Sequence, residues 1–413
     1  MVNEVLRTDI PNDWDVITLG DYAQIFRGGS PRPIQAFLTT SDQGINWIKI
    51  GDVGAGEKFI ESTEEKIIPE GVSRSRMVYK GDLILSNSMS YGRPYIMNIE
   101  GCIHDGWLVI QKYDRLFNRE YLYYALSSDL TMQQYVAMAA GSSVRNLNKE
   151  KVSKVVLPCP KILEQKKIAE VLSSIDALIV DLQKLIRKKK DIRQGTMQML
   201  VTGKKRLDGF DGEWVKINLS KNSKLKARIG WQGLTTAEYL DEGYSYLITG
   251  TDFKDGQINW NGCHYVDYNR YEQDPNIQVS NGDLLLTKDG TIGKVAYVAD
   301  LTRLATLNSG VFLVKPITDA YTAHFMFYVL ESSVFKDFLQ QLSAGSTINH
   351  LYQKDLVKFD LYVPPTKEEQ EAIAAILFDM DSDIHKLEAK LEKYQKIKQG
   401  MMEELLTGKV RLV

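Results

Sequence analysis

One long segment of the amino-acid sequence occurs twice, and its two copies lie about 205 residues apart. The first copy begins at Pro160 and the second at Pro365, and no gap is needed to align them. A chain that repeats a whole unit is expected to offer two equivalent surfaces to a partner with two equivalent halves. The identical pairs that define the repeat are Gln165 and Gln370, Ile168 and Ile373, Ala169 and Ala374, Leu172 and Leu377, Asp176 and Asp381, Gly203 and Gly408, and Arg206 and Arg411.

Apolar residues in both copies recur with alternating steps of four and three positions. Such a seam, held over many turns, predicts a coiled-coil helix rather than a surface helix of ordinary length. Each copy ends at a Thr-Gly pair, where Gly203 and Gly408 can adopt the left-handed C-cap conformation. We therefore predict two helices of about 38 residues, each on the order of 55 Å long, that pair in an antiparallel direction. The seam residues are Ile168, Leu172, Ile175, Ile179, Leu182 and Ile186, and Ile373, Leu377, Met380, Ile384, Leu387 and Leu391.

The segments that precede the helices are rich in Gly, Asn, Asp, Tyr and β-branched residues, which predicts mixed domains of short strands and a few helices. They correspond more loosely than the helices do. Lys80 to Ser86 matches Asn281 to Thr287, and Gly92-Arg93 matches Gly293-Lys294. The expected fold class is α+β, with two mixed domains, two long antiparallel helices and an internal pseudo-twofold repeat. The expected boundaries are residues 1–157 and 208–362 for the domains, and 158–207 and 363–413 for the helical spacers.

The amino-acid composition says less about the function than the repeat does. The hydrophobic content of 44% and charged content of 25% are ordinary for a globular protein. No apolar run approaches a membrane span, and the three scattered cysteines suggest reduced thiols in a cytoplasmic protein. The formal net charge of -2 counts against nonspecific DNA binding, which usually needs a basic excess, without excluding a specific reader that gathers positive charge on one surface.

Two globular units that each end in a Pro-x-x-x-Glu-Gln-x-x-Ile-Ala helix start, as at Pro160 to Ala169 and Pro365 to Ala374, resemble a known family. The chain resembles, over nearly its whole length, the DNA-specificity subunit of type I restriction–modification systems. That resemblance implies two target-recognition domains that each read half of a bipartite asymmetric sequence in double-stranded DNA. It also implies helical spacers that dock two methyltransferase subunits for adenine methylation, and restriction subunits that join this core. S-adenosylmethionine, ATP and Mg are then expected on the partner subunits and none of them in this chain.

DNA contacts are expected in polar turns that contain glycine and a cation, three in each domain. Arg and Lys neutralise phosphates or bind guanine edges, Asn and Gln can pair with adenine, and N–H groups at Gly-Ser turns suit phosphate oxygens. For any single residue, a solvated hairpin turn explains the pattern equally well; the set gains weight because the turns recur at matching places. The candidates are Arg27, Ser30, Arg32, Asn87, Ser88, Ser90, Tyr91, Arg93, Ser142, Ser143, Arg145 and Asn146, and Arg228, Trp231, Gln232, Lys288, Asp289, Thr291, Lys294, Ser346, Thr347, Asn349 and His350.

Catalytic and metal-binding motifs are weak, so we expect a specificity subunit and not an enzyme. The five histidines are scattered, and the carboxylates Asp379, Asp381 and Asp383 are interpreted as solvated helix surface near a helix N-terminus. The basic run from Arg187 to Lys190 is assigned to solvent or to a protein partner rather than to DNA. Two alternatives remain open: a coiled-coil scaffold with two protein- or ligand-binding domains, and a hydrolase with duplicated halves.

Overall fold

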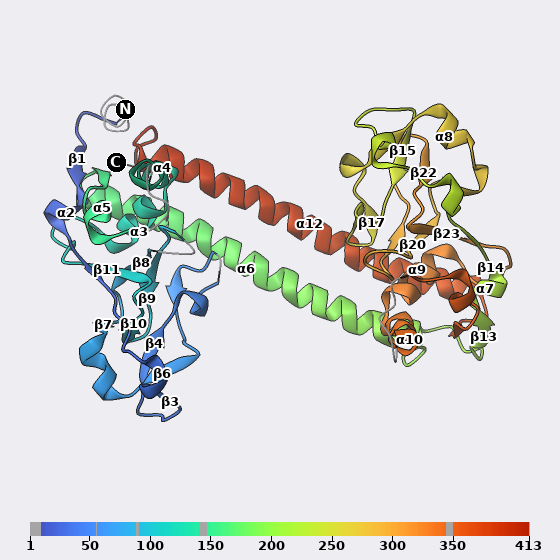
Figure 1. Cartoon of the computed structure of the whole chain (residues 1–413), viewed down its shortest axis with the longest axis horizontal. Coiled ribbons are helices and arrows are strands. Elements are labelled where there is room, and N and C mark those ends of the chain that lie inside the picture. The colour runs from blue at the N-terminus through green and yellow to red at the C-terminus, as the bar shows by residue number, and fades with distance from the viewer. Residues whose placement is uncertain (1–9, 55, 88–90, 140–146, 344–349, 413) are drawn as a thin grey trace. The chain divides into compact units, whose positions relative to one another are not determined.

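The computed structural model describes residues 10–54, 56–87, 91–139, 147–343 and 350–412, and the chain divides into two compact units (Figure 1). Unit 1 comprises residues 1–183 and 389–413, and unit 2 comprises residues 184–388. Each unit therefore contains one mixed α/β domain and one part of each long helix, and unit 1 is assembled from two separate segments of the chain whereas unit 2 is one continuous segment.

The mixed domain of unit 1 contains two five-stranded sheets and one two-stranded sheet. The run Leu83-Ile84-Leu85 is fully buried because it forms part of a central strand covered on both faces, as its unbroken apolar character predicts. In hydrogen-bonded order the strands are β2 (Gln24–Arg27), β11 (Trp107–Gln111), β8 (Leu83–Ser86), β9 (Pro94–Met97) and β5 (Phe59–Ile60); β3 (Leu38–Thr39), β6 (Glu65–Ile67), β4 (Ile45–Ile48), β10 (Gly101–Ile103) and β7 (Arg76–Val78); and β1 (Asp15–Thr18) with β12 (Val156–Cys159). The helices are α2 (Leu19–Tyr22), α3 (Arg119–Ser127), α4 (Asp129–Ala139) and α5 (Lys149–Ser153).

The mixed domain of unit 2 repeats this plan with smaller sheets. The buried run Leu284-Leu285-Leu286 forms the strand that corresponds to β8. The strands are β14 (Ser223–Lys226), β23 (Val311–Pro316), β20 (Leu284–Thr287) and β21 (Val295–Tyr297); β18 (His264–Val266), β15 (Ser245–Ile248), β22 (Ala305–Leu307) and β19 (Gln278–Val279); β13 (Val215–Asn218) with β24 (Asp360–Val363); and β16 (Phe253–Lys254) with β17 (Gln257–Ile258). The helices are α7 (Leu219–Asn222), α8 (Tyr268–Glu272), α9 (Ala323–Glu331), α10 (Ser333–Ser343) and α11 (Gln353–Leu356).

The two repeated segments form the long helices α6 (Ile162–Val201) and α12 (Lys367–Leu406), each of 40 residues. Both end as the sequence predicts, because Gly203 and Gly408 have φ angles of +69° and +74°, a left-handed conformation that only glycine adopts readily. The predicted helices and their C-caps are therefore confirmed. In the described part of the chain, no helix is both long and apolar enough to span a membrane.

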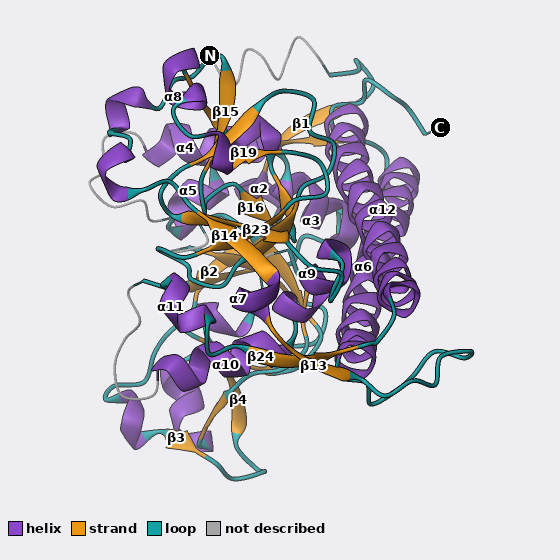
Figure 2. Ribbon diagram, turned by 90° about the vertical axis from the view of Figure 1, so that its right-hand side faces the viewer, coloured by secondary structure: helices purple, strands orange, loops and turns teal. Residues whose placement is uncertain are grey.

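The two long helices lie side by side in opposite directions within each unit (Figure 2). In unit 1 Asp176 of α6 is 2.6 Å from Lys398 of α12, and in unit 2 Arg193 of α6 is 2.8 Å from Asp381 of α12. As the residue number rises along α6, the number of its partner on α12 falls. The predicted antiparallel pairing is confirmed, and the two contacts are copies of each other in the repeat.

Each long helix begins against the end of the other. In unit 2 Arg206 donates two hydrogen bonds, of 2.6 and 2.7 Å, to the buried carboxylate of Glu369. In unit 1 Arg411 donates two bonds, of 2.7 and 2.9 Å, to the buried carboxylate of Glu164. These paired arginine–glutamate contacts close both units in the same way, and the bidentate geometry fixes the helix ends more firmly than a single contact would.

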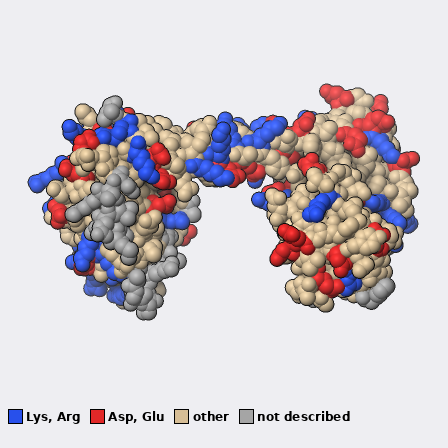
Figure 3. Space-filling view, turned by 90° about the horizontal axis from the view of Figure 1, so that it is seen from above, with Lys and Arg blue, Asp and Glu red and all other residues tan. Residues whose placement is uncertain are grey.

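One expectation for the helix carboxylates is wrong. Asp381 is not solvated surface, because it accepts hydrogen bonds from Arg193 at 2.8 Å and from the Tyr328 hydroxyl at 3.0 Å. Lys189 and Lys190 lie 3.6 Å from Asp383 and 2.7 Å from Glu388 of the facing helix. Lys and Arg side chains gather along the surface of the long helices (Figure 3). Lys189 and Lys190 are held by these intramolecular ion pairs.

Replacing Tyr328 by Phe is expected to lower the free energy of unfolding of unit 2 by about 2 kcal/mol, since it removes a hydrogen bond to a charged group. Tyr124→Phe is the matched change in unit 1, because Tyr124 donates a 2.6 Å bond to Asp176. Urea unfolding followed by circular dichroism measures both variants. Equal stability of Tyr328→Phe and the unchanged chain would show that this bond contributes nothing net.

The three cysteines are buried and unpaired, in agreement with the reduced thiols that the sequence predicts. Burial raises the pKa of Cys159 to about 11 and that of Cys263 to about 12. A thiol with a raised pKa has little reactive thiolate near neutral pH. We expect iodoacetamide at pH 8 to label the folded chain more than about tenfold more slowly than the urea-unfolded chain. Rapid labelling of the folded chain, measured by mass spectrometry, would contradict this.

Candidate nucleic-acid interface

The described parts of the first two predicted turns of unit 1 lie at one end of the sheet that contains β2, β11 and β8. Because β11 runs antiparallel to both neighbours, Leu108 pairs with Arg27 and Trp107 pairs with Ser86. The chain therefore leaves β2 and β8 at the same edge where it enters β11 from the turn at His104 to Gly106. Leu147, which follows the third predicted turn in the sequence, lies at the same edge, because its N–H donates a 3.0 Å bond to the carbonyl of Asn87.

Asp105 connects the turns at this edge. Its carboxylate accepts a 2.8 Å bond from the Ser30 hydroxyl and lies 3.9 Å from the Arg32 guanidinium. Its carbonyl accepts a 3.0 Å bond from Arg27 and a 2.9 Å bond from the buried amide of Asn87. Burial acts to raise the pKa of Asp105, but the Ser30 bond and the neighbouring charges of His104, Arg27 and Arg32 lower it overall. Asp105 thus stays ionised and holds two turns in place.

Four exposed arginines form what we call the arginine surface, comprising Arg27 and Arg32 beside Asp105, and Arg74 and Arg76 next to the first turn. Arg76 donates a 3.3 Å bond to the carbonyl of Arg27, and its guanidinium lies 4.7 Å from the centre of the Phe26 ring. The side chain of Arg32 is 84% exposed, so its charge is free to reach a ligand. Planar, permanently charged guanidinium groups are well suited to phosphate oxygens and guanine edges.

The second turn of unit 1 contributes fewer exposed groups. Arg93 is exposed, and its backbone N–H donates a 3.0 Å bond to the Ser86 hydroxyl, which closes the turn. Tyr91 is half-buried, and its hydroxyl donates to the carbonyl of Tyr135 at 3.1 Å. Asn87, with a side chain turned inward to Asp105, fits a structural role better than a direct base contact.

In unit 2 the same topology brings together the described parts of its turns. Thr287 pairs with Val311 across β20 and β23, and the N–H of Leu351 donates a 2.8 Å bond to the carbonyl of Lys288. The N–H of Lys294 donates a 2.9 Å bond to the Thr287 hydroxyl, as Arg93 does to Ser86. Across the second and third turns, His350 Nδ1 lies 2.5 Å from Asp289 Oδ1, so these two candidates are in direct contact.

The first turn of unit 2 differs from that of unit 1. Arg228 is only 2% exposed, and it donates a 2.9 Å bond to the carbonyl of Leu307 and weaker bonds to Thr306 and Gln273. Burial lowers the pKa of Arg228. Gln232 is also buried, and Trp231 lies in the short helix Gly230–Gln232. Arg228 therefore serves as an internal brace, and this placement does not suit the DNA contact that the sequence suggested.

The exposed groups of the unit 2 edge are Thr291, Lys294 and His350, with Lys288 half-buried over the Phe312 ring at 5.5 Å. Beside them, the Lys354 ammonium lies 5.1 Å from the ring of Tyr352, which is 53% exposed. The candidates Ser88, Ser90, Ser142, Ser143, Arg145, Asn146, Ser346, Thr347 and Asn349 lie outside the described residues.

Sequence reasoning missed Asp105, Arg74, Arg76, Tyr352 and Lys354. A signal for the first was present, since His104-Asp105-Gly106 has the composition of a turn between two apolar runs. No short-range pattern marks Arg74 or Arg76, which join the edge only because β7 and its preceding turn fold next to Arg27.

The chain is similar to known proteins in both of its repeated halves. A family model described as the type I restriction modification DNA specificity domain matches residues 11–194 and again residues 212–399. The MjaVIII specificity subunit of Methanocaldococcus jannaschii is 24% identical over 98% of this chain and 94% of its own length. The EcoBI specificity subunit of Escherichia coli is 22% identical over 89% of this chain and 79% of its own length.

Solved structures resemble the fold as a whole. The type I restriction–modification S subunit from M. genitalium superposes with a TM-score of 0.61 at 15% identity, covering 97% of both chains. A chain from a structure of type I restriction–modification complex assembly has a TM-score of 0.58 at 18% identity, covering 97% of this chain. These likenesses support the mixed domains and the long helix pair described above.

Proposed function

Because the chain belongs to the type I restriction–modification DNA-specificity family, we propose that it reads a bipartite, asymmetric DNA target, one half-site with each mixed domain. Its role is recognition, and catalysis belongs to other subunits. The observation that carries this proposal is that the described parts of the polar turns lie at one sheet edge in each domain, with exposed cations on that edge.

The two edges differ in chemistry, which supports an asymmetric target. Unit 1 presents the arginine surface, which suits phosphates and guanine. Unit 2 presents Lys294, His350 and the Tyr352–Lys354 pair in place of clustered arginines. Two domains with one scaffold and different edges would read different base sequences, and linking them raises affinity for a target that carries both halves.

We further propose that the chain holds two methyltransferase subunits against the DNA for adenine methylation, and that restriction subunits add to this core. The antiparallel pairs at the helix ends repeat with the same contacts, so they offer a similar framework to two copies of one partner. S-adenosylmethionine, ATP and Mg would then reside on those partners, in the cytoplasm, and this chain would bind the double-stranded DNA.

Selection of double-stranded DNA from a random pool tests the proposed function. The chain and its methyltransferase subunits would be mixed with the pool, and bound duplexes would be sequenced. We expect enrichment of two short motifs at a fixed separation. Enrichment of no motif would favour the scaffold alternative, and enrichment of a single motif would contradict two-domain reading.

The double variant Arg32→Gln/Arg76→Gln is expected to weaken DNA binding about tenfold and to reduce the slope of log affinity against log salt by about 2, because each phosphate contact releases counterions. Fluorescence anisotropy over a range of salt concentrations measures both quantities. Arg115→Gln is the matched control, since Arg115 is exposed beyond the opposite end of β11. An equal loss in the control would show that general charge, and not this edge, binds DNA.

A further inference from the structure

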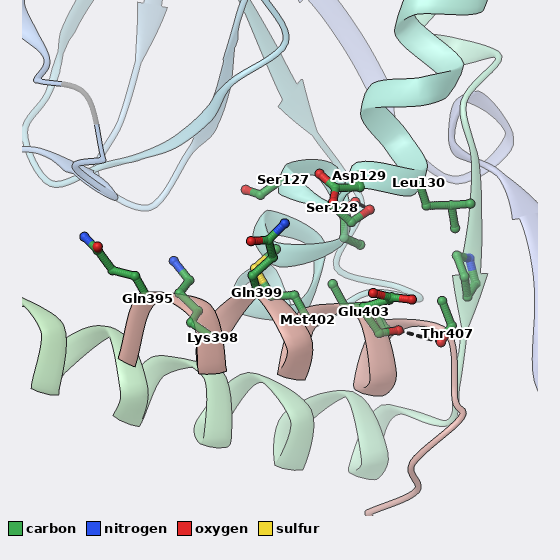
Figure 4. Close-up of a pocket in the computed structure, with 13 residues that line it drawn as sticks. Ser127, Ser128, Asp129, Leu130, Gln395, Lys398, Gln399, Met402, Glu403 and Thr407 are labelled. Carbon is green, nitrogen blue, oxygen red and sulfur yellow. Dashed lines mark hydrogen bonds between the residues drawn. The ribbon is translucent and has the colours of Figure 1, made fainter. Parts of the chain in front are cut away.

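A cavity of about 280 Å³ opens in unit 1 between the junction of α3 with α4 and the last turns of α12 (Figure 4). Its lining is largely apolar, with buried Ala125, Pro158 and Leu406 and the half-buried Leu130 and Met402. All of these residues belong to unit 1, so the cavity is a feature of one compact body.

Acidic side chains stand at the rim of this cavity. Asp129 projects from the first turn of α4 on one wall, and Glu403 projects from α12 on the other (Figure 4). Within the described chain no ion pair involves Asp129, and the Glu403 carboxylate lies 3.3 Å from the exposed ammonium of Lys409. Lys398 also lines the cavity, but its charge is matched by Asp176 at 2.6 Å. The rim is therefore acidic and the interior is apolar.

The matching place in unit 2 is closed by the chain itself. Ser333, the counterpart of Asp129 at the start of α10, donates a 2.6 Å bond to the amide oxygen of Gln198. Arg193 donates a 2.5 Å bond to Glu331 at the end of α9. Beneath these contacts Met197 is only 1% exposed, whereas its counterpart Met402 is half-buried and lines the cavity of unit 1.

Substitutions at these repeat positions account for the different contacts in the two units. Gln198 and Ser333 form a hydrogen bond, but their counterparts Glu403 and Asp129 are both acceptors when ionised and cannot form one with each other. Ser127 replaces Glu331 and cannot pair with the cation at position 398 as Glu331 pairs with Arg193. With these changes the contact that closes unit 2 is absent from unit 1, where Asp129 and Glu403 stand at the rim of the cavity.

We propose that this cavity receives a long cationic side chain, arginine or lysine, from a methyltransferase subunit. The aliphatic stem of such a side chain would cover the apolar lining while its charge reaches Asp129 and Glu403 and displaces Lys409. The proposal rests on the proposed function for the identity of the partner. It makes the two docking sites non-equivalent, because in unit 2 the matching place is closed by the Ser333–Gln198 and Arg193–Glu331 contacts.

The double variant Asp129→Ser/Glu403→Gln, which introduces the unit 2 residues, tests the proposal in the full chain. Native mass spectrometry and sedimentation velocity would give the dissociation constants of the first and second methyltransferase subunits. We expect one of the two constants to rise at least about tenfold and the other to stay unchanged. Glu404→Gln is the matched control, because Glu404 is an exposed neighbour on α12 that does not line the cavity.

A second variant, Asp129→Arg, places a cation of the chain itself at the rim. It is expected to weaken binding of the same methyltransferase subunit at least as strongly as the double variant does. Unchanged constants in both variants would overturn the cavity proposal and leave the proposed function standing. Equal weakening of both subunits would also overturn it, because the Ser333–Gln198 contact occupies the matching place in unit 2. Failure of the unchanged chain to bind any methyltransferase subunit would overturn the proposed function together with this inference.

Discussion

Inserting one heptad into α6 after Gln183 and another into α12 after Glu388 is expected to lower affinity for the native target at least about 100-fold, because both half-sites can no longer be engaged together. Seven residues lengthen a helix by about 10.5 Å, close to the rise of three base pairs. A heptad also keeps the four-three seam in register, so the helices still pair. Selection from a random duplex pool should then return the same two half-sites at a longer separation.

The control for this experiment is replacement of seven residues at each of the two places by the inserted heptads, with no change of length. That variant should retain the native separation and affinity. A lengthened chain that still selects the original separation would show that the length of the helices does not set the distance between the half-sites.

The long helices could be predicted in detail from the sequence because their determinants are local. Seam spacing and a terminal Thr-Gly act within a few residues of one another, so α6, α12 and the left-handed Gly203 and Gly408 follow directly. The division into four segments at residues 157, 207 and 362 stays a prediction. The ion pairs that cross between helices needed the antiparallel register, which explains why Asp381 was misassigned to solvent.

The candidate interface was predicted less completely because it depends on strand order. The six polar turns were recognised by composition, and the structure brings the described parts of them together at the sheet edges. Whether a cation in such a turn faces outward is a property of packing. Arg27 and Arg228 both occupy first turns, yet one is exposed and the other braces the carbonyl of Leu307.

Acid should lower the stability of unit 1, and the size of this effect should depend on Arg411. The hydrogen bonds from Arg411 lower the pKa of Glu164, and burial opposes them only in part. A lowered pKa in the folded state gives stability that is present above the ordinary pKa of the carboxyl, 4.5, and is lost as pH falls through the lowered value. Arg411→Met should remove this component, so its stability should fall less steeply below pH 4.5 than that of the unchanged chain.

In unit 2, Arg206→Met is expected to reduce the free energy of unfolding by about 3–5 kcal/mol, because the Glu369 carboxylate would remain buried without its partner. Glu369 is 1% exposed and receives two hydrogen bonds from Arg206. The double variant Arg206→Met/Glu369→Leu should recover most of that loss, since an apolar pair of similar volume carries no desolvation cost. Urea unfolding of all three chains measures the difference. A double variant as unstable as Arg206→Met would mean that this ion pair itself, and not merely the relief of a buried charge, stabilises the junction where α6 ends and α12 begins.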